Sequence, residues 1–178
     1  MINDYEARYN IKDTNYATVT NVISNDEINS ILNNLIVVSK DGEEGYKQAA
    51  ECVINSALKA KFYDYSQQRA HFAEELQSLV IELGGKPEDA GSVTGAIFRG
   101  WMDFKSVLTG KDEGAVLNEV ERGEDHAKDA YLKALEKNLP ATIHSVINNQ
   151  FGAMKEAHDH IKLMRDADNK FAQKTSSR

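Results

Sequence analysis

The chain has 178 residues, which is enough for one domain with a substantial core and too few for two ordinary ones. Its 21 Lys and Arg against 28 Asp and Glu give a net charge of −7, which makes nucleic acid and anionic membranes poor partners. Mean hydropathy is −0.53, and no apolar run approaches the roughly 20 residues that a membrane span needs. Since the N-terminus also lacks the layout of a secretory signal, and Cys52 is the only cysteine, we expect a cytoplasmic protein without a disulfide or thiolate metal cluster.

The first 25 residues are rich in Asn, Thr and Tyr, and they predict an extended arm outside the main fold. Three tyrosines in this arm, Tyr5, Tyr9 and Tyr16, are more aromatic side chains than an inert tail needs. We expect the arm to pack against its own domain or a neighbouring subunit. A homo-oligomer such as a dimer is the expected assembly.

Four long helices are predicted by apolar residues that recur at spacings of three and four. They cover about 26–54, 56–83, 112–138 and 140–166. A capping box at Ser24–Glu27 opens the first helix, the pair Gly84–Gly85 stops the second, and Pro140 marks the start of the last. The glycines of "GEEGYKQ" are interpreted as breaks or caps, and residues 167–178 as a polar, frayed tail.

The connection between the second and third long helices is long and contains a short predicted helix, Ser92–Leu108. Each long helix spans roughly 40 Å at 1.5 Å per residue, so the connection can travel the length of the bundle. One long crossover between two antiparallel hairpins is the ferritin-like topology. The predicted fold class is therefore all-α, a ferritin-like four-helix bundle over residues 26–166.

Several stretches support this fold by resemblance. They are "NLIVVSKDGEEGYKQAAE", "GSVTGAIFRGWMDFK", "ERGEDHAKDAY" and "AHDHIKLMRD". Through them the chain resembles a bacterial family of ferritin-like four-helix-bundle proteins of unknown function, over about residues 26–166. The resemblance implies a fold and not an activity, and the first 25 residues lie outside it.

One charged residue interrupts the apolar face of the second helix. Position 69 falls on the ladder that includes Phe62 and Phe72, yet it is arginine. Ferritin-like di-iron proteins place a Glu on each of two helices and Glu-x-x-His on each of the other two. Counted from the aromatic residues that mark these positions in rubrerythrin-like members, the corresponding places hold Ser39, Arg69 and Glu124. On the last helix the inward polar residue is Gln150.

By this count three of the carboxylates and both histidines are absent. A lone arginine in a bundle core is very costly to bury, but opposite Glu124 it becomes tolerable. We therefore expect Arg69 to pair with Glu124. Gln150, with Ser39 or Tyr131, would complete a buried polar network in place of a metal centre.

A competing hypothesis is that the protein binds iron or manganese through other residues. Its ligands would come from Glu44, His71, Glu75, Glu121, Glu124 and His158. Glu121 and Glu124 share one helix face at i, i+3 spacing. Against the hypothesis, neither His71 nor His158 is preceded at i−3 by the required Glu, His71 lies far from the apolar face, and solvent is the more usual place for His158.

Two function classes remain open at this point. The first is a non-enzymatic bundle without a cofactor or catalytic residue, with a structural, stress-associated or partner-binding role. The second is a divergent metal-binding oxidoreductase or iron-handling protein. No phosphate-binding loop, dinucleotide fingerprint or nucleophile elbow occurs in the sequence.

Overall fold

The computed structural model describes residues 23–91 and 112–176. These residues form four helices and no strand: α1 (Asn25–Cys52), α2 (Ser56–Glu82), α4 (Glu113–Leu135) and α5 (Ala141–Ser176). The predicted all-α bundle is confirmed. Most of the predicted N-terminal arm (residues 1–22) and the short helix predicted at Ser92–Leu108 lie outside the described residues.

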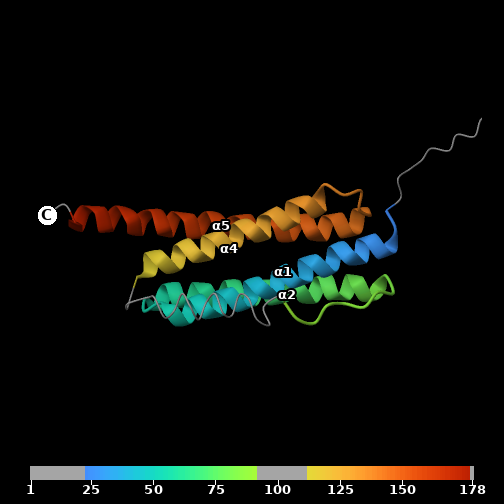
Figure 1. Ribbon diagram of the computed structural model, residues 1–178, viewed down its shortest axis with the longest axis horizontal. Coiled ribbons are helices and arrows are strands. Elements are labelled where there is room, and N and C mark those ends of the chain that lie inside the picture. Colours follow the sequence, from blue (N-terminus) through green and yellow to red (C-terminus); the bar gives the residue numbers. More distant parts are fainter. Residues whose placement is uncertain (1–22, 92–111, 177–178) are drawn as a thin grey trace, which may run out of the picture.

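The four helices lie side by side as two antiparallel hairpins (Figure 1). In that view α2 ends on the right, and α4 begins on the left and runs in the same direction as α2. The end of α2 and the start of α4 therefore lie at opposite ends of the bundle, and α2 and α4 are parallel, as the predicted crossover topology requires. Helices α2 and α4 occupy diagonal corners, while α1 and α4 are neighbours.

Side-chain caps and a glycine define the helix ends. Asn55 accepts hydrogen bonds from the backbone N–H groups of Ala57 and Leu58 and so starts α2 directly after a three-residue turn. At the other end of α2, Gly84 adopts a φ of 74°, the left-handed conformation that glycine tolerates best. Ser24 caps α1 as predicted, by accepting a hydrogen bond from the N–H of Glu27.

The buried apolar residues form two clusters rather than one continuous core. One cluster contains Ile28, Leu32, Leu35, Ile36, Val38, Ala73, Leu76, Val80, Ala127, Tyr131, Ala134, Leu139, Ile143, Ile147 and Met154. The other contains Tyr46, Ala49, Ala50, Val53, Leu58, Phe62, Val116, Leu117, Val120 and Ile161. On α2, Arg69 stands between Phe62 of one cluster and Ala73 of the other. A polar layer therefore separates the two apolar ends of the bundle.

Two details differ from the sequence prediction. The chain does not fray after residue 166, because α5 continues to Ser176. The segment "ADNKFAQKTS" contains no Gly or Pro to end a helix, and its Ala, Lys and Gln favour helix, so polarity alone was a poor stop signal. Likewise Gly42 and Gly45 do not break or cap a helix; they lie inside α1.

None of the helices in the described parts of the chain combines the length and the apolar character that crossing a membrane requires.

Candidate functional site: a buried polar layer

Arg69 is the largest buried polar side chain of the described residues and lies at the centre of the layer. It is 0% exposed, and its Nη2 donates a 2.7 Å hydrogen bond to Oε2 of Glu124, which is 3% exposed. The guanidinium carbon lies 5.4 Å from the centre of the Phe72 ring and 5.8 Å from that of Tyr46. The charge is thus held between one carboxylate and two aromatic rings.

Burial and pairing act in opposite directions on Arg69. Burial by itself lowers the pKa of the guanidinium, but the negative charge of Glu124, together with their hydrogen bond, outweighs it and the net shift is upward. Nη1 donates to Oε1 of the neighbouring Gln68 at 3.0 Å. Nε is buried and has no hydrogen-bond partner among the described residues. The arginine is therefore permanently charged and only partly satisfied.

A glycine on α1 makes room for this side chain. A Cβ atom at Gly42 would lie 3.3 Å from Cγ and 3.4 Å from Cδ of Arg69. Contacts this short require the neighbour to give way. The absence of a side chain at Gly42 therefore lets the aliphatic part of the arginine pass directly beneath α1, which gives this helix glycine a packing role.

A second set of hydrogen bonds crosses the bundle beside the ion pair. The hydroxyl of Ser39 on α1 lies 3.0 Å from that of Tyr131 on α4, and Tyr131 donates to Oε1 of Gln150 on α5 at 2.8 Å. Nε2 of Gln150 then donates to Glu75 on α2 at 2.7 Å and to the Phe72 carbonyl at 3.4 Å. All four helices thus contribute to the layer.

The structure distributes the predicted network residues differently from the sequence prediction. Gln150, Ser39 and Tyr131 bond to one another rather than to Arg69, whose second partner is Gln68. Gln68 was missed because it is adjacent to Arg69 and points off the apolar face. The sequence suggests Glu75 only as a metal ligand. Its position six residues after Arg69 does not predict the hydrogen bond to Gln150 on another helix.

The two buried tyrosines of the layer are held in the neutral form. Burial is the main cause that raises the pKa of Tyr131 from 10.0 to about 12, with smaller opposing effects from its hydrogen bond to Ser39 and from the charge of Arg69. Burial, followed by the charge of Glu124, raises the pKa of Tyr46 well above 10.0. Both phenols therefore act as neutral groups across the ordinary pH range.

The fold implies a di-metal centre, so the fit of the layer to a metal can be tested on its side chains. Of the residues at the counted positions, Ser39, Arg69 and Gln150 are poor or impossible ligands for iron or manganese. The one carboxylate among them, Glu124, is bonded to Arg69. No group of three or more His, Cys, Asp or Glu side chains that could hold a metal ion occurs within residues 23–91 and 112–176. The side chains of the polar layer therefore do not fit a di-metal centre.

The residues of the competing metal hypothesis have separate partners. Glu44 accepts from Gln48 at 2.7 Å, and Glu121 accepts from Arg165. His71 is exposed and lies near Glu74, while Glu75 is bonded to Gln150. The structure does not bring these side chains together around one point.

His158 is buried at 7% exposure, contrary to the expectation that it faces solvent. Its two ring nitrogens lie 3.1 Å from a carboxylate oxygen of Asp125 on α4 and 3.1 Å from one of Asp159 on α5. Nζ of Lys128 also lies 3.3 Å from Nε2. These polar neighbours offset the cost of burying the ring, a compensation that helical periodicity alone does not reveal.

The arrangement of the four helices defines the class of protein. The solved structures most relevant here share the fold at low identity. A two-domain protein from Anabaena variabilis, containing DJ-1/ThiJ/PfpI-like and ferritin-like domains, matches with a TM-score of 0.66 and 10% identity over 83% of this chain. A conserved hypothetical protein from Mycobacterium tuberculosis matches with a TM-score of 0.63 and 11% identity over 81% of this chain and 94% of its own length. The molecule is a ferritin-like four-helix bundle.

The chain also matches the model of a protein family. The model of the family described as "Domain of unknown function (DUF2383)" matches residues 27–137, more than half of the sequence, and the chain belongs to this family. The match to the Anabaena variabilis protein covers 38% of that longer chain, and no curated protein matches. These likenesses establish the fold and the family and leave the activity to be argued from the site.

Proposed function

We propose that the protein is a non-enzymatic member of the ferritin-like fold, in which a polar layer built on Arg69, Glu124 and Gln150 takes the place of the di-metal centre. Its role would be structural, stress-associated or partner-binding, as a homo-oligomer in the cytoplasm. The observation that carries the proposal is the position of Arg69. A buried guanidinium pairs with the one surviving carboxylate at the level where the fold otherwise assembles metal ligands.

The chemistry of the donor set supports a binding or structural role. The positive charge that a metal would bring to Glu124 comes instead from a side chain that cannot be deprotonated in a protein. Such a cation neither changes oxidation state nor offers a position for a reactant. A buried ion pair of this kind contributes more to the register of packed helices than to net stability, and the register of the helices is what a binding scaffold must keep.

Elemental analysis tests the proposal. Protein purified without chelators should contain iron and manganese well below one ion per chain, and Glu124→Ala should leave that content unchanged. Glu156→Ala, an exposed glutamate on α5, is the matched control. Stoichiometric metal that is lost in Glu124→Ala and kept in Glu156→Ala would overturn the proposal and restore the oxidoreductase or iron-handling alternative.

A further inference from the structure

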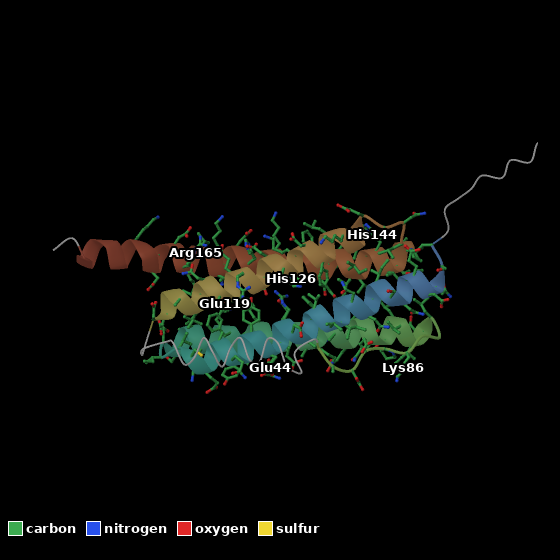
Figure 2. All side chains as sticks on the ribbon, viewed as in Figure 1. Glu44, Lys86, Glu119, His126, His144 and Arg165 are labelled. Atoms are coloured by element: carbon green, nitrogen blue, oxygen red, sulfur yellow. The ribbon has the colours of Figure 1, made fainter. Side chains whose placement is uncertain are left out.

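A pocket of about 330 Å³ opens between α1 and α4, directly over the polar layer. It is lined by Val38, Asp41, Gly42, Gly45, Tyr46, Glu119, Val120, Arg122, Gly123, Glu124 and His126. Figure 2 labels Glu119 and His126 along α4, the helix that forms one wall. The pocket is at the small end of the roughly 300–1,000 Å³ that ligand sites occupy, so its occupant must be compact.

Glycines create much of this space. The lining includes Gly42 and Gly45 on α1 and Gly123 on α4, three positions in helix interiors where glycine is unfavourable by about 0.5–1 kcal/mol relative to alanine. A Cβ atom at Gly123 would meet nothing within 4 Å. These glycines therefore lower the stability of their helices, but they leave open volume beside the polar layer.

Two buried polar side chains of the pocket lining, Glu124 and Tyr46, carry oxygen atoms that can accept hydrogen bonds. Glu124 uses Oε2 to bind Arg69, and its Oε1 accepts no hydrogen bond from the described residues that meets ordinary geometry. The hydroxyl of Tyr46 is 97% buried with its side chain and makes no hydrogen bond of ordinary geometry to the described residues, although it is near enough for Glu124 to raise its pKa. The Tyr46 hydroxyl therefore lies close enough to the Glu124 carboxylate for its O–H to interact with it, and its oxygen accepts no hydrogen bond from the described residues.

The charge around the pocket favours a cation. Three carboxylates line it, from Asp41, Glu119 and Glu124. The guanidinium of Arg122 pairs with Glu119, and that of Arg69 pairs with Glu124. Arg122 is not a free anion-binding group. Its side chain is 77% exposed and donates two hydrogen bonds to Glu119.

We propose that this pocket binds a small primary ammonium compound, with the ammonium at Glu124 Oε1 and the Tyr46 hydroxyl and a short alkyl chain against Val38 and Val120. An ammonium carries three N–H donors and so suits two neighbouring acceptors, while the alkyl part suits the valines and the bare glycine backbone. The inference rests on the proposed function, because it names a ligand class for a bundle that acts by binding.

Titration of the full-length protein with n-butylammonium, followed by backbone amide shifts in NMR spectra, tests the inference. Saturable shifts should appear on α1 and α4 around the pocket. The isosteric n-butanol and the anion butyrate should bind at least about tenfold more weakly, a difference of about 1.4 kcal/mol. Gly123→Leu, which fills the open volume, should abolish the shifts. Gly152→Leu is the matched control, since Gly152 on α5 also has nothing within 4 Å and is remote from the lining.

Each alternative outcome contradicts the inference. Equal binding of n-butanol means an apolar cavity without cation preference. Binding that survives Gly123→Leu places the ligand elsewhere. If none of the three compounds shifts the amide signals, the pocket does not bind small primary ammonium compounds. Metal content is measured on the same sample: stoichiometric metal would contradict the proposed function whatever the titration shows, whereas absent metal with absent amine binding contradicts the pocket inference alone.

Discussion

Arg69 on α2 and Glu124 on α4 form a 2.7 Å ion pair between helices at diagonal corners of the bundle. Since α2 belongs to the first hairpin and α4 to the second, the pair fixes how one hairpin sits on the other. Apolar contacts between the hairpins are non-directional and do not by themselves select one alignment. The ion pair is specific to one alignment, which is the register role described above.

The first prediction concerns this pair. Glu124→Ala should lower the free energy of unfolding by about 3–5 kcal/mol, because it leaves the Arg69 charge buried without a partner. The double variant Arg69→Met, Glu124→Leu should cost far less or even stabilise, since apolar packing replaces two desolvated charges. Urea unfolding of the wild type, Arg69→Met, Glu124→Leu and the double variant measures the coupling. A double variant as unstable as the sum of the singles would show that the pair is not energetically linked.

The second prediction is a loss of stability at alkaline pH. The folded-state pKa of Tyr131 is raised from 10.0 to about 12, so the folded protein holds its proton more tightly than the unfolded chain does. Stability is full below pH 10.0 and falls as the pH rises to about 12, by up to about 2–3 kcal/mol from this group. Tyr46, whose pKa is also raised, adds a further loss in the same direction.

Chemical unfolding across this pH range, with tyrosinate absorbance as a second measurement, checks the prediction. Tyr131→Phe should start less stable, because Gln150 and Ser39 lose a partner, and should then show a shallower decline with pH. If the slopes of the wild type and of Tyr131→Phe coincide, Tyr131 is not the group that links stability to pH.

The helices and the crossover followed from the sequence because apolar periodicity, Ser24, Asn55 and Gly84–Gly85 all act locally. The inward position of Arg69 followed as well, since it occupies one step of an apolar ladder. The identity of its partners did not follow completely. Helical periodicity gives a face but not the height at which residues of different helices meet, so neither the Glu75–Gln150 bond nor the burial of His158 between two aspartates could be read from it.

The third prediction concerns assembly. We expect the segment before Ile23 to contribute to a homo-oligomer through Tyr5, Tyr9 and Tyr16. Deletion of residues 1–22 keeps the Ser24 cap of α1 and should reduce the solution mass measured by light scattering. Substitution of the three tyrosines by serine in the full-length chain is the matched control for a specific aromatic contribution. Unchanged mass and unchanged melting temperature in both variants would leave the segment without this role.

The last prediction uses the glycines to test the packing of Arg69. Gly123→Ala and Gly152→Ala should each stabilise the protein by about 0.5–1 kcal/mol, because a helix favours alanine and the added Cβ meets nothing within 4 Å. Gly42→Ala carries the same gain in helix propensity, but its Cβ would lie 3.3 Å from Cγ of Arg69 and 3.7 Å from Nε. The arginine is held by Glu124 on one side and by Phe72 on another, so it has little freedom to move away.

We therefore expect Gly42→Ala to be neutral or destabilising, with the other two alanine variants as matched controls for helix propensity. Gly42→Leu should be severely destabilising, while Gly152→Leu is tolerated. The measurement is the free energy of unfolding of all five variants under one set of conditions. A Gly42→Ala variant as stable as Gly123→Ala would mean that Arg69 relaxes without cost. In that case the close approach of α1 to the ion pair would not be what requires glycine at position 42.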